Sequence, residues 1–118
     1  MKNKFGGDEN QSLENWIETK TLKITKDYPD FKTFYDNERK DIYLEHVTAF
    51  ENLQNTREVE KTITVIGVID GQEFTTNFEI SKKSFNGTSN ALISFFESIE
   101  DYETCTKLVN LRQYFQNN

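Results

Sequence analysis

Residues 60–80 read EKTITVIGVIDGQEFTTNFEI, and the rest of the chain is best understood as built around them. Apolar and polar side chains alternate on both sides of Asp70-Gly71, the pattern of two strands joined by a tight turn. Asp-Gly suits the two positive-φ positions of a type I′ turn, whose twist matches that of the flanking strands. The sequence therefore predicts an antiparallel β-hairpin whose register is set by its turn.

The hairpin needs further structure around it, because an isolated hairpin is marginally stable in water. Its first strand is apolar on both faces from Ile63 to Ile69, as expected for a strand covered from both sides. The second strand alternates more strictly and should keep one face in water. Helices must pack on this pair or a third strand must join it, and residues 20–26 and 42–50 are the two candidates for that strand.

Three segments before the hairpin have helical spacing. Ser12 is a candidate N-cap for an apolar set at Leu13, Trp16 and Ile17. Pro29 suits the first turn of a short helix carrying Phe31, Phe34 and Tyr35. From Glu38 to about Gln54, one face collects Tyr43, His46, Val47, Phe50 and Leu53, so helix is preferred there over strand.

Two helices are predicted after the hairpin. A polar loop from Ser81 to Thr88 leads into the first, with Thr88 or Ser89 as its cap. Its apolar stripe comprises Ala91, Leu92, Phe95, Phe96 and Ile99. A break near Asp101 precedes the second helix, in which Cys105, Leu108, Val109, Arg112 and Phe115 lie at helical steps. We expect Phe95, Phe96 and Ile99 to pack on the sheet together with Trp16 and Phe50.

These elements define an α+β fold, in which a central antiparallel β-hairpin, part of a small antiparallel sheet of two or three strands, is packed with N-terminal and C-terminal helices. Residues 11–118 are expected to form a single domain and the polar residues 1–10 a flexible arm. The chain has one cysteine, no signal-peptide pattern and no apolar run near the ~20 residues of a membrane span. A cytoplasmic protein without membrane contact is the expectation.

Little in the chain favours catalysis. Its one histidine, His46, could join Asp41 and Glu45 in a metal site, but acidic pairs four residues apart are common on solvated helix faces. The one Cys/His pair is Cys105 with His46, and Cys105 lies on an apolar stripe where the pKa of a thiol rises. No phosphate-binding glycine loop is present. We therefore expect a non-enzymatic protein without cofactor or metal.

Charge gives the remaining functional signal. Twenty acidic and fourteen basic side chains give a net charge of −6, which disfavours direct binding of nucleic acid and favours a protein partner with a basic surface. The acidic side chains most suited to such contact fall in two groups, Asp41 and Glu45, and Glu97, Glu100, Asp101 and Glu103.

The functional hypothesis is a small acidic inhibitor that binds and blocks a nuclease or defence complex, in the manner of an anti-CRISPR or immunity protein, by mimicking nucleic-acid charge. The alternatives are a small metal-dependent enzyme or module using Asp41, Glu45 and His46, and a structural subunit whose hairpin edge builds a homodimer or larger homo-oligomer. A third reading of the acidic clusters is that they are only a solvated surface.

Overall fold

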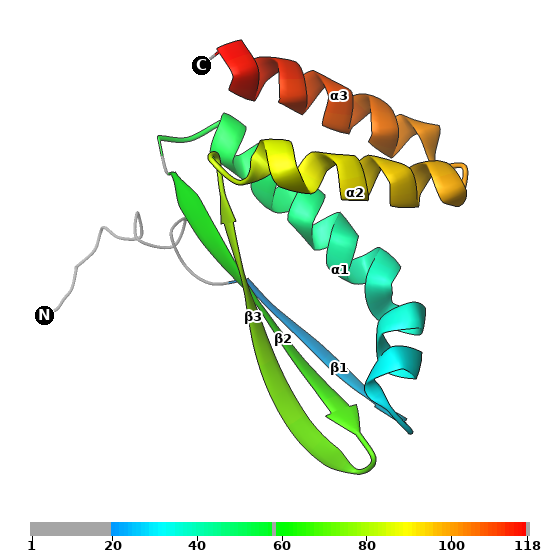
Figure 1. The fold of residues 1–118 in the computed structure, drawn as a ribbon. Helices are drawn as coiled ribbons and strands as arrows, with labels where there is room; N and C mark the ends of the chain where they lie inside the picture. The colour runs from blue at the N-terminus through cyan, green and yellow to red at the C-terminus, as the bar shows by residue number, and fades with distance from the viewer. Residues whose placement is uncertain (1–19, 58, 118) are drawn as a thin grey trace, which may run out of the picture.

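The computed structural model describes residues 20–57 and 59–117, so the predicted arm at 1–10 and the helix predicted to begin at Ser12, with Trp16, lie outside the described residues. Its elements confirm the α+β class (Figure 1). In chain order they are β1 (Lys20–Tyr28), α1 (Phe31–Gln54), β2 (Glu60–Ile69), β3 (Gln72–Ser81), α2 (Phe85–Ser98) and α3 (Tyr102–Asn117).

The hairpin forms as predicted. β2 and β3 pair antiparallel in an unbroken register from Glu60 opposite Ser81 to Ile69 opposite Gln72. Asp70 and Gly71 have φ angles of 52° and 76°, the left-handed conformation that the turn requires. Local turn chemistry and strand alternation are therefore sufficient to specify this part of the chain.

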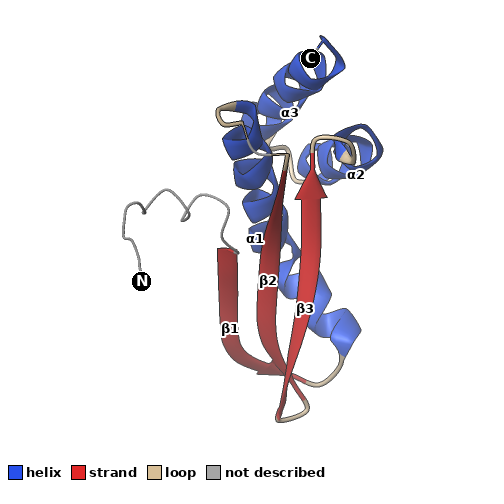
Figure 2. Cartoon of the chain, turned by 90° about the vertical axis from the view of Figure 1, so that its left-hand side faces the viewer, coloured by secondary structure: helices blue, strands red, loops and turns tan. Residues whose placement is uncertain are grey.

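A third strand joins the hairpin, but it makes the sheet mixed and the expectation of a purely antiparallel sheet wrong. Residues 20–28 form this strand, β1, which pairs in parallel with β2, so the strand order is β1-β2-β3 (Figure 2). Parallel neighbours need a long crossover connection, and α1 supplies it. Residues 42–50, the other candidate strand, lie inside α1.

α1 is one helix rather than the two that were predicted between Phe31 and Gln54. Asp30 caps it, because its side chain accepts a hydrogen bond of 2.8 Å from the backbone N–H of Thr33. Neither proline nor glycine occurs within residues 31–54, so the helix has no reason to end between its two apolar sets.

The sheet is covered by α1 on one face (Figures 1 and 2). Ile63 and Val65 are buried on that face of β2, whereas Ile66 and Val68 on the other face are half-buried. Within the described residues no helix covers this second face, so the expectation that the first hairpin strand is covered from both sides is not met there.

α2 and α3 pack across the C-terminal half of α1. The expectation that α2 packs on the sheet is therefore wrong. Aromatic rings make these contacts, with centroids 4.6 Å apart for Phe50 and Phe85 and 5.1 Å apart for Tyr43 and Phe95. Phe50 and Phe96 are fully buried, as predicted. Ile99 is 41% exposed, contrary to prediction, because α2 ends at Ser98 and Ile99 leaves the buried stripe.

α2 also starts earlier than predicted, at Phe85, so Thr88 and Ser89 lie inside the helix and neither caps it. Two serines replace them in closing the turn before it. The backbone N–H of Ser84 donates to Oγ of Ser81 at 3.1 Å, and the backbone N–H of Ser81 donates to Oγ of Ser84 at 3.2 Å. This reciprocal pair ends β3 and turns the chain directly into the helix.

Candidate functional site

The connection between α2 and α3 exposes both charge and apolar surface. α2 ends at Ser98, Glu100 adopts a φ of 61°, and α3 begins at Tyr102. Ile99 is 41% exposed and Tyr102 is 62% exposed. We call this surface the acidic corner and define it as Glu97, Ile99, Glu100, Tyr102 and Glu103.

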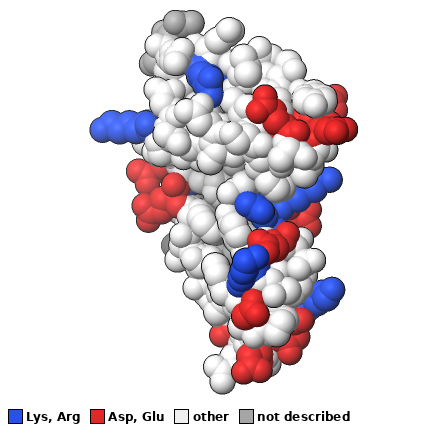
Figure 3. Space-filling view, turned by 45° about the vertical axis from the view of Figure 1, so that its right-hand side comes forward, with Lys and Arg blue, Asp and Glu red and all other residues white. Residues whose placement is uncertain are grey.

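The three glutamates of the acidic corner are exposed, and none forms an ion pair with another described residue. Figure 3 shows acidic side chains gathered at this end of the helical layer, while along α1 acidic and basic side chains alternate. Negative charges held together without partners make the local electrostatic potential strongly negative, and a cationic group can neutralise it. The acidic corner is thus suited to contact with a basic surface.

Asp101 belongs to the same stretch but has a structural role. Its Oδ1 accepts a hydrogen bond from the backbone N–H of Thr104 at 3.1 Å, and its Oδ2 accepts one from the Thr104 hydroxyl at 2.8 Å. These bonds lower the pKa of Asp101, with smaller contributions from the charges of Lys40 and Lys107. Asp101 therefore caps α3, and its carboxylate is already occupied.

The second predicted acidic group lies on α1. Asp41 is exposed and Glu45 is half-buried, one helical turn further on. Lys40, the neighbour of Asp41, is close enough to Asp101 for its charge to lower the pKa of that carboxyl. The α1 side of the acidic corner thus carries positive charge, and Asp41 and Glu45 do not simply extend the corner.

His46 is not arranged as a metal ligand beside these carboxylates. It is only 7% exposed, its Nδ1 lies 2.9 Å from the carbonyl oxygen of Ile42, and its ring contacts Tyr43 and Phe78. Burial lowers the pKa of His46, so the neutral ring is favoured. Within residues 20–57 and 59–117, no three His, Cys, Asp or Glu side chains group as a metal site would require.

Cys105 is a buried thiol, as its position on the apolar stripe predicted. Its Sγ donates to the carbonyl oxygen of Ile93 at 3.7 Å. Burial raises the pKa of Cys105, and the nearby charges of Glu97 and Asp101 raise it further. The reactive thiolate form is therefore disfavoured.

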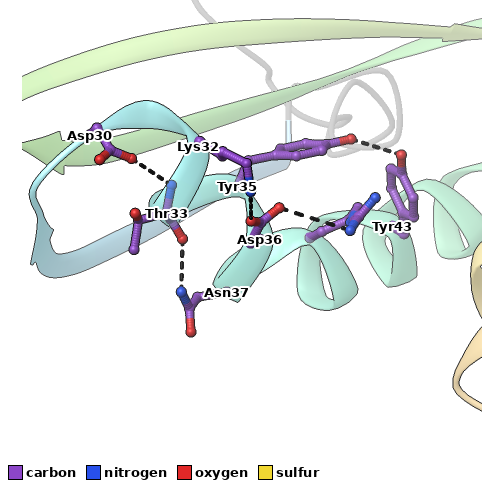
Figure 4. Close-up of polar contacts among 8 residues, drawn as sticks. Asp30, Lys32, Thr33, Tyr35, Asp36, Asn37 and Tyr43 are labelled. Atoms are coloured by element: carbon purple, nitrogen blue, oxygen red, sulfur yellow. Dashed lines mark hydrogen bonds and ion pairs between the residues drawn. The ribbon is translucent and has the colours of Figure 1, made fainter.

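A second surface feature was not predicted. Aromatic side chains from α1, β3 and α2 contact one another along one side of α1, and we call Phe31, Tyr35, Tyr43, Phe74 and Phe95 the aromatic strip. The Tyr35 and Tyr43 hydroxyl oxygens lie 2.7 Å apart (Figure 4), and burial together with this hydrogen bond raises the pKa of Tyr35 to about 12.

Arg39 lies within the aromatic strip. Its guanidinium carbon is 5.3 Å from the ring centre of Tyr35 and 5.1 Å from that of Phe95, distances typical of cation–π contacts. Residues 31, 35, 39 and 43 recur every fourth position, and this spacing was the available signal. It was missed because the strip is completed by side chains from β3 and α2.

Comparisons of the chain with protein-family models, curated proteins and solved structures find no match. None of the helices in the described part of the chain combines the length and the apolar character that crossing a membrane would need.

Proposed function

We propose that this protein is a non-enzymatic interaction protein that binds a basic surface of a protein partner through the acidic corner. One observation carries the proposal. Two exposed apolar side chains, Ile99 and Tyr102, stand in a stretch of seven residues, 97–103, that also holds three exposed glutamates without ion-pair partners among the described residues.

The two components have separate physical roles. An exposed tyrosine supplies a large contact area at a low cost in side-chain entropy, and such residues dominate the affinity of many interfaces. Carboxylates around it contribute less to affinity, but they accelerate association with a positively charged partner and reject acidic ones. Together they favour a partner whose apolar pocket is surrounded by Lys and Arg.

Binding at such a surface would produce inhibition if the partner uses its basic groove for nucleic acid. Glu97, Glu100 and Glu103 would then occupy positions otherwise taken by phosphates, and Tyr102 would add contacts that phosphates cannot make. A nuclease or a nucleic-acid-guided defence complex has a groove of this kind. A protein that acts in this way is an inhibitor and not an enzyme.

The decisive experiment compares two variants with the same net charge. In Glu100→Gln/Glu103→Gln the acidic corner loses two carboxylates, and in the control Glu51→Gln/Glu60→Gln two are lost from α1 and β2. Tagged wild-type protein and both variants are used to capture binding proteins from cells of the native host, followed by mass spectrometry and titration of the purified partner.

We expect the wild type and the control to bind one basic protein equally, and the corner variant to bind it at least about tenfold more weakly. Tyr102→Ala should weaken binding by a similar factor. If the two double variants bind the captured protein equally, the acidic corner is not the interface.

A further inference from the structure

The geometry points to a second binding site: the outer edge of β3, which pairs with no other strand among the described residues, accepts an extended segment of a protein partner, whose basic side chains face Glu73 and Glu79. This inference rests on the sheet and the aromatic strip, and does not depend on the acidic corner.

The two edges of the sheet differ in how well they are protected. In the strand order β1-β2-β3, β1 and β3 are the outer strands. β1 carries three lysines, at positions 20, 23 and 26, and its register shifts between Lys23 and Asp27. Lysines and bulges are devices that keep other strands from pairing with an edge. β3 runs from Gln72 to Ser81 without lysine, proline or irregularity, so it has neither device.

The turn determines which backbone groups of β3 point away from β2. Ile69 and Gln72 flank a two-residue turn and therefore exchange both of their hydrogen bonds. Because such pairs alternate along an antiparallel ladder, every second residue of β3 directs its N–H and C=O away from β2. These residues are Glu73, Thr75, Asn77 and Glu79. An added antiparallel strand would find its hydrogen-bonding partners there.

The face of β3 toward α1 offers a ready apolar surface to such a strand. Phe74 and Phe78 are half-buried on this face. The ring centroid of Phe74 lies 6.0 Å from that of Phe31, and the ring centroid of Phe78 lies 5.2 Å from that of His46. Phe31 is itself 56% exposed. Every second side chain of an added strand would lie beside Phe74 and Phe78 and along the aromatic strip, which would bury this exposed surface.

The opposite face of β3 selects the occupant by charge. Glu73 and Glu79 are exposed there, and neither forms an ion pair with another described residue. In the two-fold registers that overlap β3 most fully with itself, Glu73 of one copy lies opposite Glu79 of the other or diagonally next to it. Like charges in these positions destabilise a pair of strands, whereas Lys or Arg would stabilise it. A second copy is therefore disfavoured and a basic segment is favoured.

The test uses a synthetic peptide of about nine residues, with valines alternating with polar residues and two lysines about six positions apart to match Glu73 and Glu79. Two substitutions at one position isolate the edge. Thr75→Pro removes an outward N–H and blocks pairing, while the hydrogen bonds between β2 and β3 remain; Thr75→Val keeps the N–H and serves as the control.

We expect the peptide to bind the wild type and Thr75→Val alike, and Thr75→Pro at least about tenfold more weakly, as measured by fluorescence anisotropy. Glu73→Lys/Glu79→Lys should prefer a peptide in which both lysines are replaced by glutamates, and this variant tests the site even if Thr75→Pro does not fold. The corner variant Glu100→Gln/Glu103→Gln should bind the peptide normally, which separates this site from the acidic corner.

Three results would overturn the inference. They are equal binding of the peptide to Thr75→Pro and Thr75→Val, an unchanged preference for lysine in Glu73→Lys/Glu79→Lys, and dimerisation of the wild type in sedimentation velocity that Thr75→Pro abolishes. The last result would assign the edge of β3 to a second copy of the chain.

Discussion

Phe34 of α1 packs directly on the backbone of Gly67 in β2. A Cβ atom added at Gly67 would lie 2.6 Å from Cε2 of Phe34 and 2.6 Å from Cε1 of Phe74, closer than carbon atoms can approach. The absence of a side chain at this position therefore allows α1 to cover the sheet, and Phe34 is 1% exposed as a result.

Gly67→Ala should lower the free energy of unfolding by ~1–3 kcal/mol, because two aromatic rings must move to accommodate the methyl group. Urea denaturation measures this change. Gly87→Ala is the matched control, since an added Cβ meets no atom within 4 Å in α2, and helix propensity should make that variant ~0.5–1 kcal/mol more stable. Equal stability of the two variants would contradict the close packing at Gly67.

Gly71→Val tests the turn of the hairpin. Gly71 has a φ of 76° and an added Cβ would meet no atom within 4 Å, so strain in the backbone is the whole effect. A β-branched residue resists this conformation, and the substitution should cost ~1 kcal/mol or more in urea denaturation. Gly71→Asn should cost less, since asparagine tolerates the left-handed region. If valine and asparagine cost the same, the strain argument fails.

The sequence was sufficient where the determining interactions are local. The hairpin follows from Asp70-Gly71 and its alternating flanks, and the break between α2 and α3 follows from the loss of apolar spacing near Asp101. The parallel pairing of β1 with β2 was not predictable in the same way. It depends on where α1 returns the chain, and alternation in residues 20–26 is the same for either strand direction.

The candidate site was predicted only in part, because the sequence shows where acidic residues cluster but not which of them form hydrogen bonds or where the helix ends. The cluster of acidic residues within 97–103 indicates exposed charge, which the structure confirms for Glu97, Glu100 and Glu103. The sequence alone did not distinguish Asp101 from these glutamates. Its carboxylate accepts hydrogen bonds from Thr104. The sequence also assigned Ile99 to the core, since helical spacing alone does not show that the helix ends one residue earlier.

Phe96 and Ile99 lie three residues apart, and their truncation should have very different effects. Phe96 is fully buried, so Phe96→Ala should cost ~3–5 kcal/mol, a large part of the stability of a domain this size. Ile99 is 41% exposed, and Ile99→Ala should change stability by less than ~1 kcal/mol. Thermal or urea denaturation distinguishes the two. Comparable losses would place Ile99 back in the core and remove it from the acidic corner.

His46 should make stability depend on pH. Burial lowers its pKa in the folded protein below the ordinary value of ~6.5, so the unfolded chain binds the proton more readily. The stability contributed by the neutral ring is fully present above the pKa of His46 in the unfolded chain. It is lost as the pH falls through the lower pKa of the folded protein. Between about pH 7.5 and 5 the wild type should lose more stability in urea than His46→Gln, which shares its carboxylates. A parallel loss in both proteins would show that His46 is not the cause.

The last prediction separates charge from apolar contact at the acidic corner, once the partner has been purified. Glu100→Lys/Glu103→Lys should fold normally, because both side chains are exposed and neither pairs with another described residue. Its association with a basic partner should be slower, and wild-type affinity should fall with added salt, since charges are screened beyond a Debye length of ~8–10 Å.

Tyr102→Ala should change the dissociation rate rather than the association rate. It removes apolar contact and leaves every charge in place, so dissociation should become faster while association and its salt dependence stay close to those of the wild type. Stopped-flow or surface-plasmon measurements at several salt concentrations resolve the two effects. Salt-insensitive binding that survives the double charge reversal would leave Glu100 and Glu103 as a solvated surface, and recognition would then have to reside in Tyr102 or in another face of the protein.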